Sequence, residues 1–351
     1  MSDTLRRPEE LVEAGLIAPE RAIEIAAVAD RYAVSITQDV ALLIDPVNAA
    51  DPIARQFVPD ARELLIAPEE RADPIGDHAH EPVKGIVHRY PDRVLLKPIH
   101  VCPVYCRFCF RREEVGPGSE ALSPVELDAA LDYIRAHDAI WEVILSGGDP
   151  LMLSARRLKS IIQALEAIPH VAVIRIHTRV PVVDPERVTA ALVGALRSDK
   201  AVYVVLHANH PRELTSAVRA AAGRLARAGV PLLSQSVLLR GVNDDAAILE
   251  ALFRGLVAMR VKPYYLHHPD LAQGTAHLRT GLSEGRELMR ALRGRVSGLC
   301  QPAYVLDLPG GHGKVPVGPS YARATGAPGE WQVEDPQGDS HLYPPRNFLS
   351  K

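Results

Sequence analysis

The sequence predicts an α/β fold in which six strand–helix units form a partial (β/α)6 barrel or an open parallel sheet. From Arg93 onward, short apolar segments rich in β-branched residues alternate with segments whose apolar residues recur at helical spacing. Such alternation is typical of parallel strands joined by right-handed helical crossovers. The expected strands cover residues 94–101, 142–145, 171–176, 201–206, 231–238 and 262–266. The expected helices cover residues 124–136, 154–168, 185–196, 213–228, 245–259 and 283–292.

Two further regions flank the barrel, which is expected over residues 86–300. Residues 1–85 are predicted to form an N-terminal helical cap, because Leu11–Val34 has helical spacing and five prolines interrupt residues 46–74. Residues 301–351 form a C-terminal segment, in which 302–308 is compatible with one more strand. From Ala322 the chain is rich in Gly, Pro and polar residues, and this tail is expected to wrap the surface.

Composition excludes several classes of protein. The 351 residues carry 40 Lys and Arg against 43 Asp and Glu, a net charge of −3, which argues against nucleic-acid binding as the main function. The N-terminus lacks the apolar region of a secretion signal, and no run reaches the roughly 20 apolar residues that a membrane helix needs. We therefore expect a cytoplasmic protein that binds neither nucleic acid nor membrane.

Three of the four cysteines lie within eight residues of one another and predict a metal centre rather than disulfides. Cys102, Cys106 and Cys109 have the spacing C-x3-C-x2-C. Three thiolates on one tight loop can bind three corners of a [4Fe–4S] cluster and leave the fourth iron open to a co-substrate. Zinc is the competing interpretation, but structural zinc requires four ligands, and the remaining cysteine is the distant Cys300.

Polar side chains follow the predicted strands, which places the site at the C-terminal ends of the strands. Those at or near strand ends are Cys102, Ser146, His177, His207 and Gln235. The histidines there and in the loops that follow lack a metal-ligand motif and are predicted to line a cofactor pocket instead. They are His177, His207, His210, His267 and His268.

The glycine-rich stretch Pro309–Lys314 does not fit a phosphate-binding loop, because the G-x4-G-K-[ST] pattern is broken by Leu308 and Val315. Two interpretations remain. Lys314 could carry pyridoxal phosphate (PLP), with glycines that give the cofactor room to approach. Alternatively, Lys314 is a solvated lysine in a surface turn, which the local sequence alone favours.

The cysteine motif, with an aromatic residue before each of its last two cysteines and directly after the first strand, resembles the radical SAM superfamily. Residues Ser146, Gly147, Gly148 and Asp149 resemble that superfamily's GGE-type motif. The resemblance implies a radical-SAM-type partial barrel in which the backbone and carboxylate of this motif meet the methionyl amino group of S-adenosylmethionine (SAM).

A further set of segments, spread over about two-thirds of the chain, resembles lysine 2,3-aminomutase, a PLP-dependent radical SAM family. The matching segments are 88–95, the cysteine motif with Arg111, 145–150, 235–244, 263–274 and 307–314. The resemblance implies an isomerase that interconverts L-lysine and β-lysine by a 5′-deoxyadenosyl-radical 1,2-amino shift on PLP. The radical SAM partial barrel then carries a C-terminal PLP-binding extension.

The resemblance also implies residue roles. Lys314 would carry PLP, Arg111 would meet the substrate carboxylate, and Asp270 and Asp307 would meet its distal ammonium. Two carboxylates aimed at one ammonium would favour lysine over glutamate. The positions that match the surroundings of the cofactors are Arg89, Tyr90, Arg93 and Gln235 for PLP and His207 for SAM.

The chain departs from the longer family members, which carry further cysteines near the C-terminus for an intersubunit zinc. No cysteine follows Cys300, so we expect no structural zinc, although a homo-oligomer is still expected. The length resembles shorter relatives that make β-lysine for elongation factor P, but Asp307–Lys314 follows the long enzymes. A radical SAM enzyme for another amino acid is a further alternative. The expected reductant is a one-electron carrier such as flavodoxin or ferredoxin.

Overall fold

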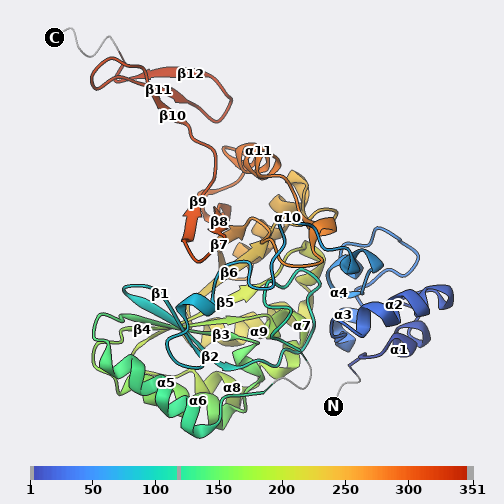
Figure 1. The fold of residues 1–351 in the computed structure, drawn as a ribbon. Helices are drawn as coiled ribbons and strands as arrows, with labels where there is room; N and C mark the ends of the chain where they lie inside the picture. Colours follow the sequence, from blue (N-terminus) through green and yellow to red (C-terminus); the bar gives the residue numbers. More distant parts are fainter. Residues whose placement is uncertain (1–3, 117–119, 346–351) are drawn as a thin grey trace.

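A sheet of nine strands forms the centre of the molecule (Figure 1). The computed structural model describes residues 4–116 and 120–345. The strands lie in sequence order across the sheet, and β2 to β8 are parallel, whereas β1 and β9 are antiparallel edge strands. The strands are β1 Ile86–Tyr90, β2 Arg93–Ile99, β3 Glu142–Gly147, β4 Val173–Thr178, β5 Ala201–His207, β6 Leu232–Val237, β7 Val261–His267, β8 Ala303–Leu308 and β9 Gly313–Pro316.

The sheet curls until its two edges meet. The backbone amide of Lys314 on β9 donates a hydrogen bond to the hydroxyl of Tyr90 on β1, over 2.7 Å. The predicted α/β partial barrel is confirmed, and each of the six predicted strands lies within two residues of its expected bounds. The compatible segment 302–308 supplies β8, while the edge strands β1 and β9 were not predicted.

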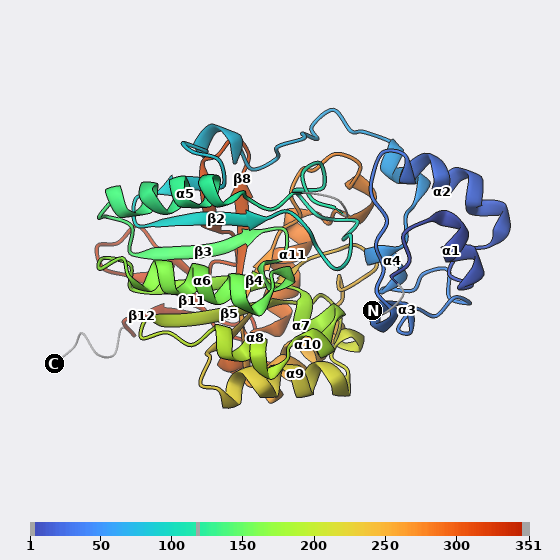
Figure 2. The same ribbon diagram turned by 90° about the horizontal axis from the view of Figure 1, so that it is seen from below.

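Helices cover the outer face of the sheet (Figure 2). The longer ones begin at side chains that accept hydrogen bonds from the first helical turn, namely Ser123, Ser154, Thr215 and Asp245. The helices are α5 Pro124–Ala136, α6 Ala155–Glu166, α7 Val180–Val183, α8 Ala190–Ala195, α9 Ser216–Arg227, α10 Ala246–Ala258 and α11 Leu282–Leu292.

The prediction of one helix over residues 185–196 was wrong. A 3-10 turn covers Pro185–Arg187, and α8 begins only after Thr189. Val188 has non-helical backbone angles, and the Thr189 side chain accepts a hydrogen bond from the amide of Leu192. The threonine therefore starts a new helix instead of continuing an older one.

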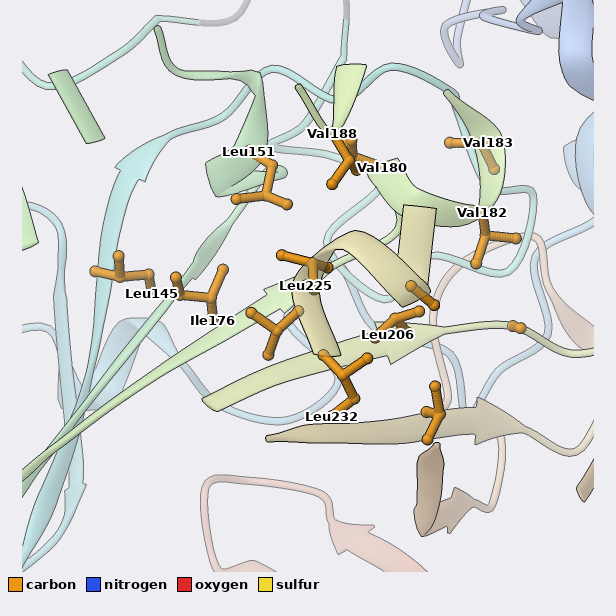
Figure 3. Close-up of a cluster of buried hydrophobic side chains, with 14 of the residues drawn as sticks. Leu145, Leu151, Ile176, Val180, Val182, Val183, Val188, Leu206, Leu225 and Leu232 are labelled. Carbon is orange, nitrogen blue, oxygen red and sulfur yellow. The ribbon is translucent and has the colours of Figure 1, made fainter. Parts of the chain in front are cut away.

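The main hydrophobic core lies between the sheet and this helical layer (Figure 3). Residues alternate along each strand: on β4, Ile174 and Ile176 belong to this core, whereas Arg175 and His177 line the interior of the barrel. Burying one such aliphatic side chain contributes roughly 1.5–3 kcal/mol. The core residues labelled in the close-up include Leu145, Ile176, Leu206, Leu225 and Leu232.

The N-terminal region packs beside the C-terminal ends of the strands. Its helices are α1 Pro8–Glu13, α2 Ala22–Ala29, α3 Gln38–Ala41 and α4 Ala54–Phe57. The predicted helical spacing over Leu11–Val34 is split into α1 and α2, because Gly15 adopts a left-handed conformation (φ +70°). Backbone carbonyls of this layer accept hydrogen bonds from Tyr105 and Arg107 and thus contact the cysteine loop.

The tail forms a small separate sheet rather than a wrapped coil, so that expectation was wrong. Its strands are β10 Ala322–Ala324, β11 Trp331–Glu334 and β12 Ser340–Tyr343, and they project away from the barrel (Figure 1). Glycines with positive φ form its turns, and Glu334 pairs with Arg290 of α11. The remainder of the predicted tail, 346–351, lies outside the described residues. Across the described chain, no helix is long and apolar enough to cross a membrane.

Candidate active site

One cavity of about 550 Å³ occupies the interior of the barrel. This volume lies within the usual range for small-molecule sites. Sixteen residues to which the sequence assigned a role in catalysis or in binding cofactor, substrate or metal line this chamber, although they come from segments up to 225 positions apart. They are Arg89, Tyr90, Arg93, Cys102, Cys106, Cys109, Arg111, Ser146, Gly147, Gly148, Asp149, His207, Gln235, Asp270, Asp307 and Lys314.

The three clustered cysteines carry free thiols on the loop after β2. Burial raises the pKa of each thiol, and that of Cys109 rises to about 12. A thiolate here therefore needs a nearby positive charge, such as the iron of a cluster. The side chain of Arg179 supplies part of that charge, because its Nη1 donates a hydrogen bond to Cys106 Sγ at 2.8 Å. Three soft donors on one loop fit an iron–sulfur cluster.

A buried ionic cluster fixes the cysteine loop to the N-terminal layer. The carboxylate of Glu63 has no solvent exposure and accepts hydrogen bonds from Arg107, with Nη2–Oε2 at 2.5 Å and Nε–Oε1 at 2.9 Å. The same carboxylate also accepts a short hydrogen bond from Arg112. Because Arg107 and Arg112 flank Cys109, this carboxylate holds the loop from both sides of its last cysteine.

The motif 146–149 packs directly on the cysteine loop. The amides of Gly148 and Asp149 donate to the carbonyls of Ile99 and Val101, at 2.7 and 2.9 Å. A Cβ at Gly148 would lie 2.5 Å from the Val101 oxygen, so only glycine fits. The Asp149 carboxylate accepts from Thr178 Oγ1 at 2.7 Å and from the amides of Leu151, Arg179 and Val180 at 3.0, 2.6 and 3.0 Å.

These hydrogen bonds limit which groups of the motif can contact SAM. The carboxylate of Asp149 and two of the motif's amides already have protein partners. The Asp149 carbonyl accepts from the amide of Met152 at 2.9 Å, but a carbonyl has two lone pairs and can also accept a hydrogen bond from an amino group. The contact of this motif with the methionyl amino group stays a prediction. The backbone carbonyls, rather than the carboxylate, are the groups expected to accept its hydrogen bonds.

Lys314 lies on β9 at the seam of the barrel and is not a solvated lysine in a surface turn. Its Nζ is 2.7 Å from Asp307 Oδ2 and 5.6 Å from the ring centre of Tyr265. The glycines before it are packed: a Cβ at Gly311 would meet His80 Nε2 at 2.6 Å. Close packing with positive φ explains the glycine-rich stretch without a phosphate loop.

Tyr90 and Arg93 lie beside Lys314. The Arg93 guanidinium stacks on the Tyr90 ring, 3.8 Å from its centre, and Tyr90 holds the Lys314 backbone. These two residues, with Arg89, offer donors and positive charge for a phosphate next to an amine. The residue types at this end of the chamber therefore fit PLP.

Asp270 follows β7 and lies deep in the chamber wall. Burial, followed by the charge of Asp307, raises the pKa of Asp270 to about 7. The positive charges of Lys314 and Arg111 act in the opposite direction. Two neighbouring carboxylates of this kind are best satisfied by one cation placed between them.

Arg111 lies at the chamber wall with only 8% of its side chain exposed. Its Nε and Nη2 donate to Asp77 Oδ2, at 3.0 and 2.7 Å. Its remaining nitrogen, Nη1, faces Ser146 Oγ at 3.5 Å. The guanidinium thus has one edge bound by protein and one nitrogen directed toward the motif at the end of β3.

The histidines divide into two groups. His177, His207 and His267 line the chamber, and burial lowers the pKa of all three, that of His207 to about 3. The expectation that His210 and His268 line it too was wrong. His210 caps a 3-10 turn through its Nδ1, and His268 pairs with the hydroxyl of Tyr304 at 2.7 Å.

The sequence interpretation missed three residues that support the site: Glu63, Asp77 and Arg179. The first two come from a segment whose prolines obscure any periodicity, so no local pattern marks them. Arg179 stands two residues after the strand-end His177, and its place at the end of β4 was the one available signal.

Residues 96–252 match the family model of the radical SAM superfamily, and residues 289–328 match the model described as lysine-2,3-aminomutase. The L-lysine 2,3-aminomutase of Acetoanaerobium sticklandii is 43% identical over 313 residues, which cover 89% of this chain and 76% of that protein. That of Clostridium subterminale is 45% identical over 287 residues, with 82% and 69% covered.

The glutamate 2,3-aminomutase of Clostridioides difficile is also similar, at 38% identity over 284 residues, with 81% of this chain and 67% of that protein covered. A [4Fe–4S] cluster, SAM and PLP are the cofactors of this kind of enzyme, and the thiols and the lysine site described above fit them. The matches span the barrel and the segment that carries Lys314, and the chain belongs to the lysine 2,3-aminomutase family of the radical SAM superfamily.

Proposed function

We propose that this protein interconverts L-lysine and β-lysine by a 1,2-amino shift. The observation that carries the proposal is the arrangement of charge in one chamber. The carboxylate of Asp307 pairs with Lys314, that of Asp270 lies within the electrostatic influence of both, and the guanidinium of Arg111 lines the same chamber. A substrate with a carboxylate at one end and an ammonium at the other matches this distribution.

Each cofactor has a set of residues that would hold it. Cys102, Cys106 and Cys109 would bind the cluster and leave one iron open to SAM, while the carbonyls of 146–149 and His207 would contact SAM. When bound, the cluster and SAM supply the 5′-deoxyadenosyl radical that removes a substrate hydrogen, and PLP holds the migrating nitrogen. Lys314 would carry PLP, with Arg89, Tyr90, Arg93 and Gln235 around it.

The residues of this chain orient the substrate and exclude water. Arg111 holds the α-carboxylate, and Asp270 and Asp307 hold the ε-ammonium, so both ends of the extended lysine are fixed. Fixing both ends leaves the β-carbon in one place relative to the cofactors. The buried wall also protects a reactive radical from solvent.

Glutamate is the second candidate substrate, because one relative is a glutamate 2,3-aminomutase. Its distal carboxylate would face Asp270 and Asp307, and like charges at a desolvated site cost several kcal/mol. The charge pattern therefore favours lysine.

The remaining features of the proposal concern the cell. We place the enzyme in the cytoplasm as a homo-oligomer that receives electrons from a one-electron carrier such as flavodoxin or ferredoxin. The division of the chain into three regions, with boundaries after residues 85 and 300, also remains a prediction. The product β-lysine could serve metabolism or the modification of elongation factor P, and the chemistry of the site is the same in both cases.

The test is substrate preference. We expect kcat/KM for L-lysine to exceed that for L-glutamate by more than about 100-fold, from two unfavourable charge contacts. Asp307→Asn should reduce this ratio by roughly 10-fold or more, because one of the two repulsive charges is removed. Equal rates with both amino acids, or a preference for glutamate, would contradict the assignment of the two aspartates.

A further inference from the structure

Asp77 is a buried carboxylate of the N-terminal layer that no step of the proposed reaction uses. We propose that Asp77 is a positioning residue for substrate recognition: it fixes Arg111 and Arg89 in the orientation in which Arg111 donates hydrogen bonds to the substrate carboxylate. The inference rests on the proposed function, because it assumes that Arg111 binds an amino acid carboxylate.

The geometry at Asp77 leaves little freedom to either arginine. Oδ2 accepts both Nε and Nη2 of Arg111, at 3.0 and 2.7 Å, and Oδ1 accepts Nη2 of Arg89 at 2.9 Å. Asp77 is 3% exposed, and the Arg89 side chain is 10% exposed. The same Nη2 of Arg89 also donates to the carbonyl of Ile75 at 2.7 Å. One carboxylate thus binds two guanidinium groups away from solvent.

The contacts with Asp77 also determine which edge of the Arg111 guanidinium is left for the substrate. Because Asp77 binds the Nε–Nη2 edge, the donors left for a substrate are those of the Nη1–Nη2 edge, where Nη1 makes only a long hydrogen bond to Ser146 Oγ at 3.5 Å. An unrestrained arginine could rotate and offer either edge, since its side chain has several rotatable bonds. Asp77 fixes the guanidinium in one orientation before the substrate binds. A donor that is already oriented loses less conformational entropy on binding.

Asp77 also connects the two ends of the chamber. Arg89 Nη1 lies 3.7 Å from Asp307 Oδ1, and Asp307 Oδ2 lies 2.7 Å from Lys314 Nζ. Charges therefore alternate without a break from Arg111 through Asp77, Arg89 and Asp307 to Lys314. The groups predicted to hold the substrate carboxylate, the cofactor and the substrate ammonium are linked through this one N-terminal residue.

Charge keeps Asp77 in the form that this role needs. Burial acts to raise the pKa of Asp77, but the positive charges of Arg111, Arg89 and Lys97 outweigh it and hold the pKa below its usual range. The carboxylate is consequently ionised throughout the pH range in which an enzyme assay is run. A purely structural brace would also be ionised, so the experiment must separate positioning from folding.

The experiment compares L-lysine with L-lysinamide, which keeps both amines but lacks the carboxylate. Rates are measured for the cluster-loaded, PLP-loaded full chain and for Asp77→Asn, which preserves shape and removes charge. The parent should prefer lysine, and Asp77→Asn should reduce the kcat/KM ratio of lysine to lysinamide by about 10-fold, mostly through KM. Asp132→Asn, at an exposed pair with Arg135 on α5, is the matched control and should leave the ratio unchanged.

A structural role would lower both rates equally and leave the ratio intact, so an unchanged ratio in Asp77→Asn overturns the inference. If Asp77→Asn does not fold by circular dichroism, Asp77→Glu keeps the charge but displaces it by one methylene. That variant should reduce the ratio by a smaller factor, and an unchanged ratio would again overturn the inference. Absence of β-lysine from the parent chain overturns the proposed function and this inference together, whereas an active parent with an unaffected ratio overturns this inference alone.

Discussion

Removal of the charge on Glu63 should destabilise the protein strongly, although this residue lies outside the chamber. In the substitution Glu63→Gln, Arg107 and Arg112 remain buried but lose the carboxylate that both of them bind. Both guanidinium side chains are 1% exposed and Glu63 is fully buried, so water cannot replace the lost charge. Breaking a buried ion pair by removing one partner costs about 3–5 kcal/mol.

The two arginines also donate to backbone carbonyls, which cannot replace the lost carboxylate. Arg107 Nη1 donates to the carbonyl of Ala33 at 2.7 Å, and Arg112 Nη1 donates to the carbonyls of Arg107 and Gln273 at 3.2 and 3.1 Å. These bonds satisfy donors but supply no negative charge. We therefore expect the full range of about 3–5 kcal/mol to appear in the free energy of unfolding.

The assay is urea denaturation followed by circular dichroism, with iron and sulfide measured on the reconstituted protein. With a denaturant dependence of about 3 kcal/mol per molar urea, the midpoint should fall by roughly 1–1.7 M. Because the carboxylate braces both sides of Cys109, bound iron and sulfide should fall as well. A midpoint within about 0.2 M of the parent, together with full cluster content, would refute the view that this ionic cluster holds the loop.

Three further predictions concern the chamber. Lys314→Ala should abolish the absorbance of bound PLP and the activity while iron and sulfide remain at the parent level; retained PLP absorbance would refute its assigned role. The KM for L-lysine should rise as the pH falls through about 7, because Asp270, whose pKa is raised by burial and then by Asp307, becomes protonated and loses the charge that holds the ammonium. Steady-state kinetics at several pH values measure this, and Asp270→Asn should flatten the profile; an equal pH dependence in that variant counts against the assignment. Arg179→Gln should lower bound iron and sulfide after reconstitution, since Cys106 loses its charged donor, and Arg179→Lys should recover part of the loss; full cluster content in Arg179→Gln would contradict this.

Much of the fold could be predicted because the barrel repeats one simple unit. The strand–helix alternation predicted both the parallel strands and the edge of the sheet at which the site lies. Since parallel strands end at a common edge, residues such as Cys102 and Gln235 were expected to meet, and they line one chamber.

The edges of the sheet could not be predicted in this way. β1 and β9 are short, and their antiparallel pairing depends on neighbours that are distant in sequence, such as Tyr90 and Lys314. The local sequence around Lys314 even favoured a surface turn. Only the curling of the whole sheet places this lysine inside the barrel.

The residues that hold the site residues in place could not be predicted from the sequence either. Glu63 and Asp77 act through arginines 44 and 34 residues away, and they stand among turns and 3-10 helices that have no periodicity. Each would ordinarily be taken for a solvated surface carboxylate. Their burial follows from the packing of the N-terminal layer on the cysteine loop, and that packing is a property of the folded chain.

The most direct test of the central claim is the reaction itself. Purified protein, reconstituted with iron and sulfide and supplied anaerobically with PLP, SAM, dithionite and L-lysine, should form β-lysine, detected by mass spectrometry, and Cys106→Ala should form none. Cleavage of SAM to 5′-deoxyadenosine with no β-lysine would contradict the account, because the radical chemistry would then be present without the amino shift that Lys314, Asp270 and Asp307 are proposed to support.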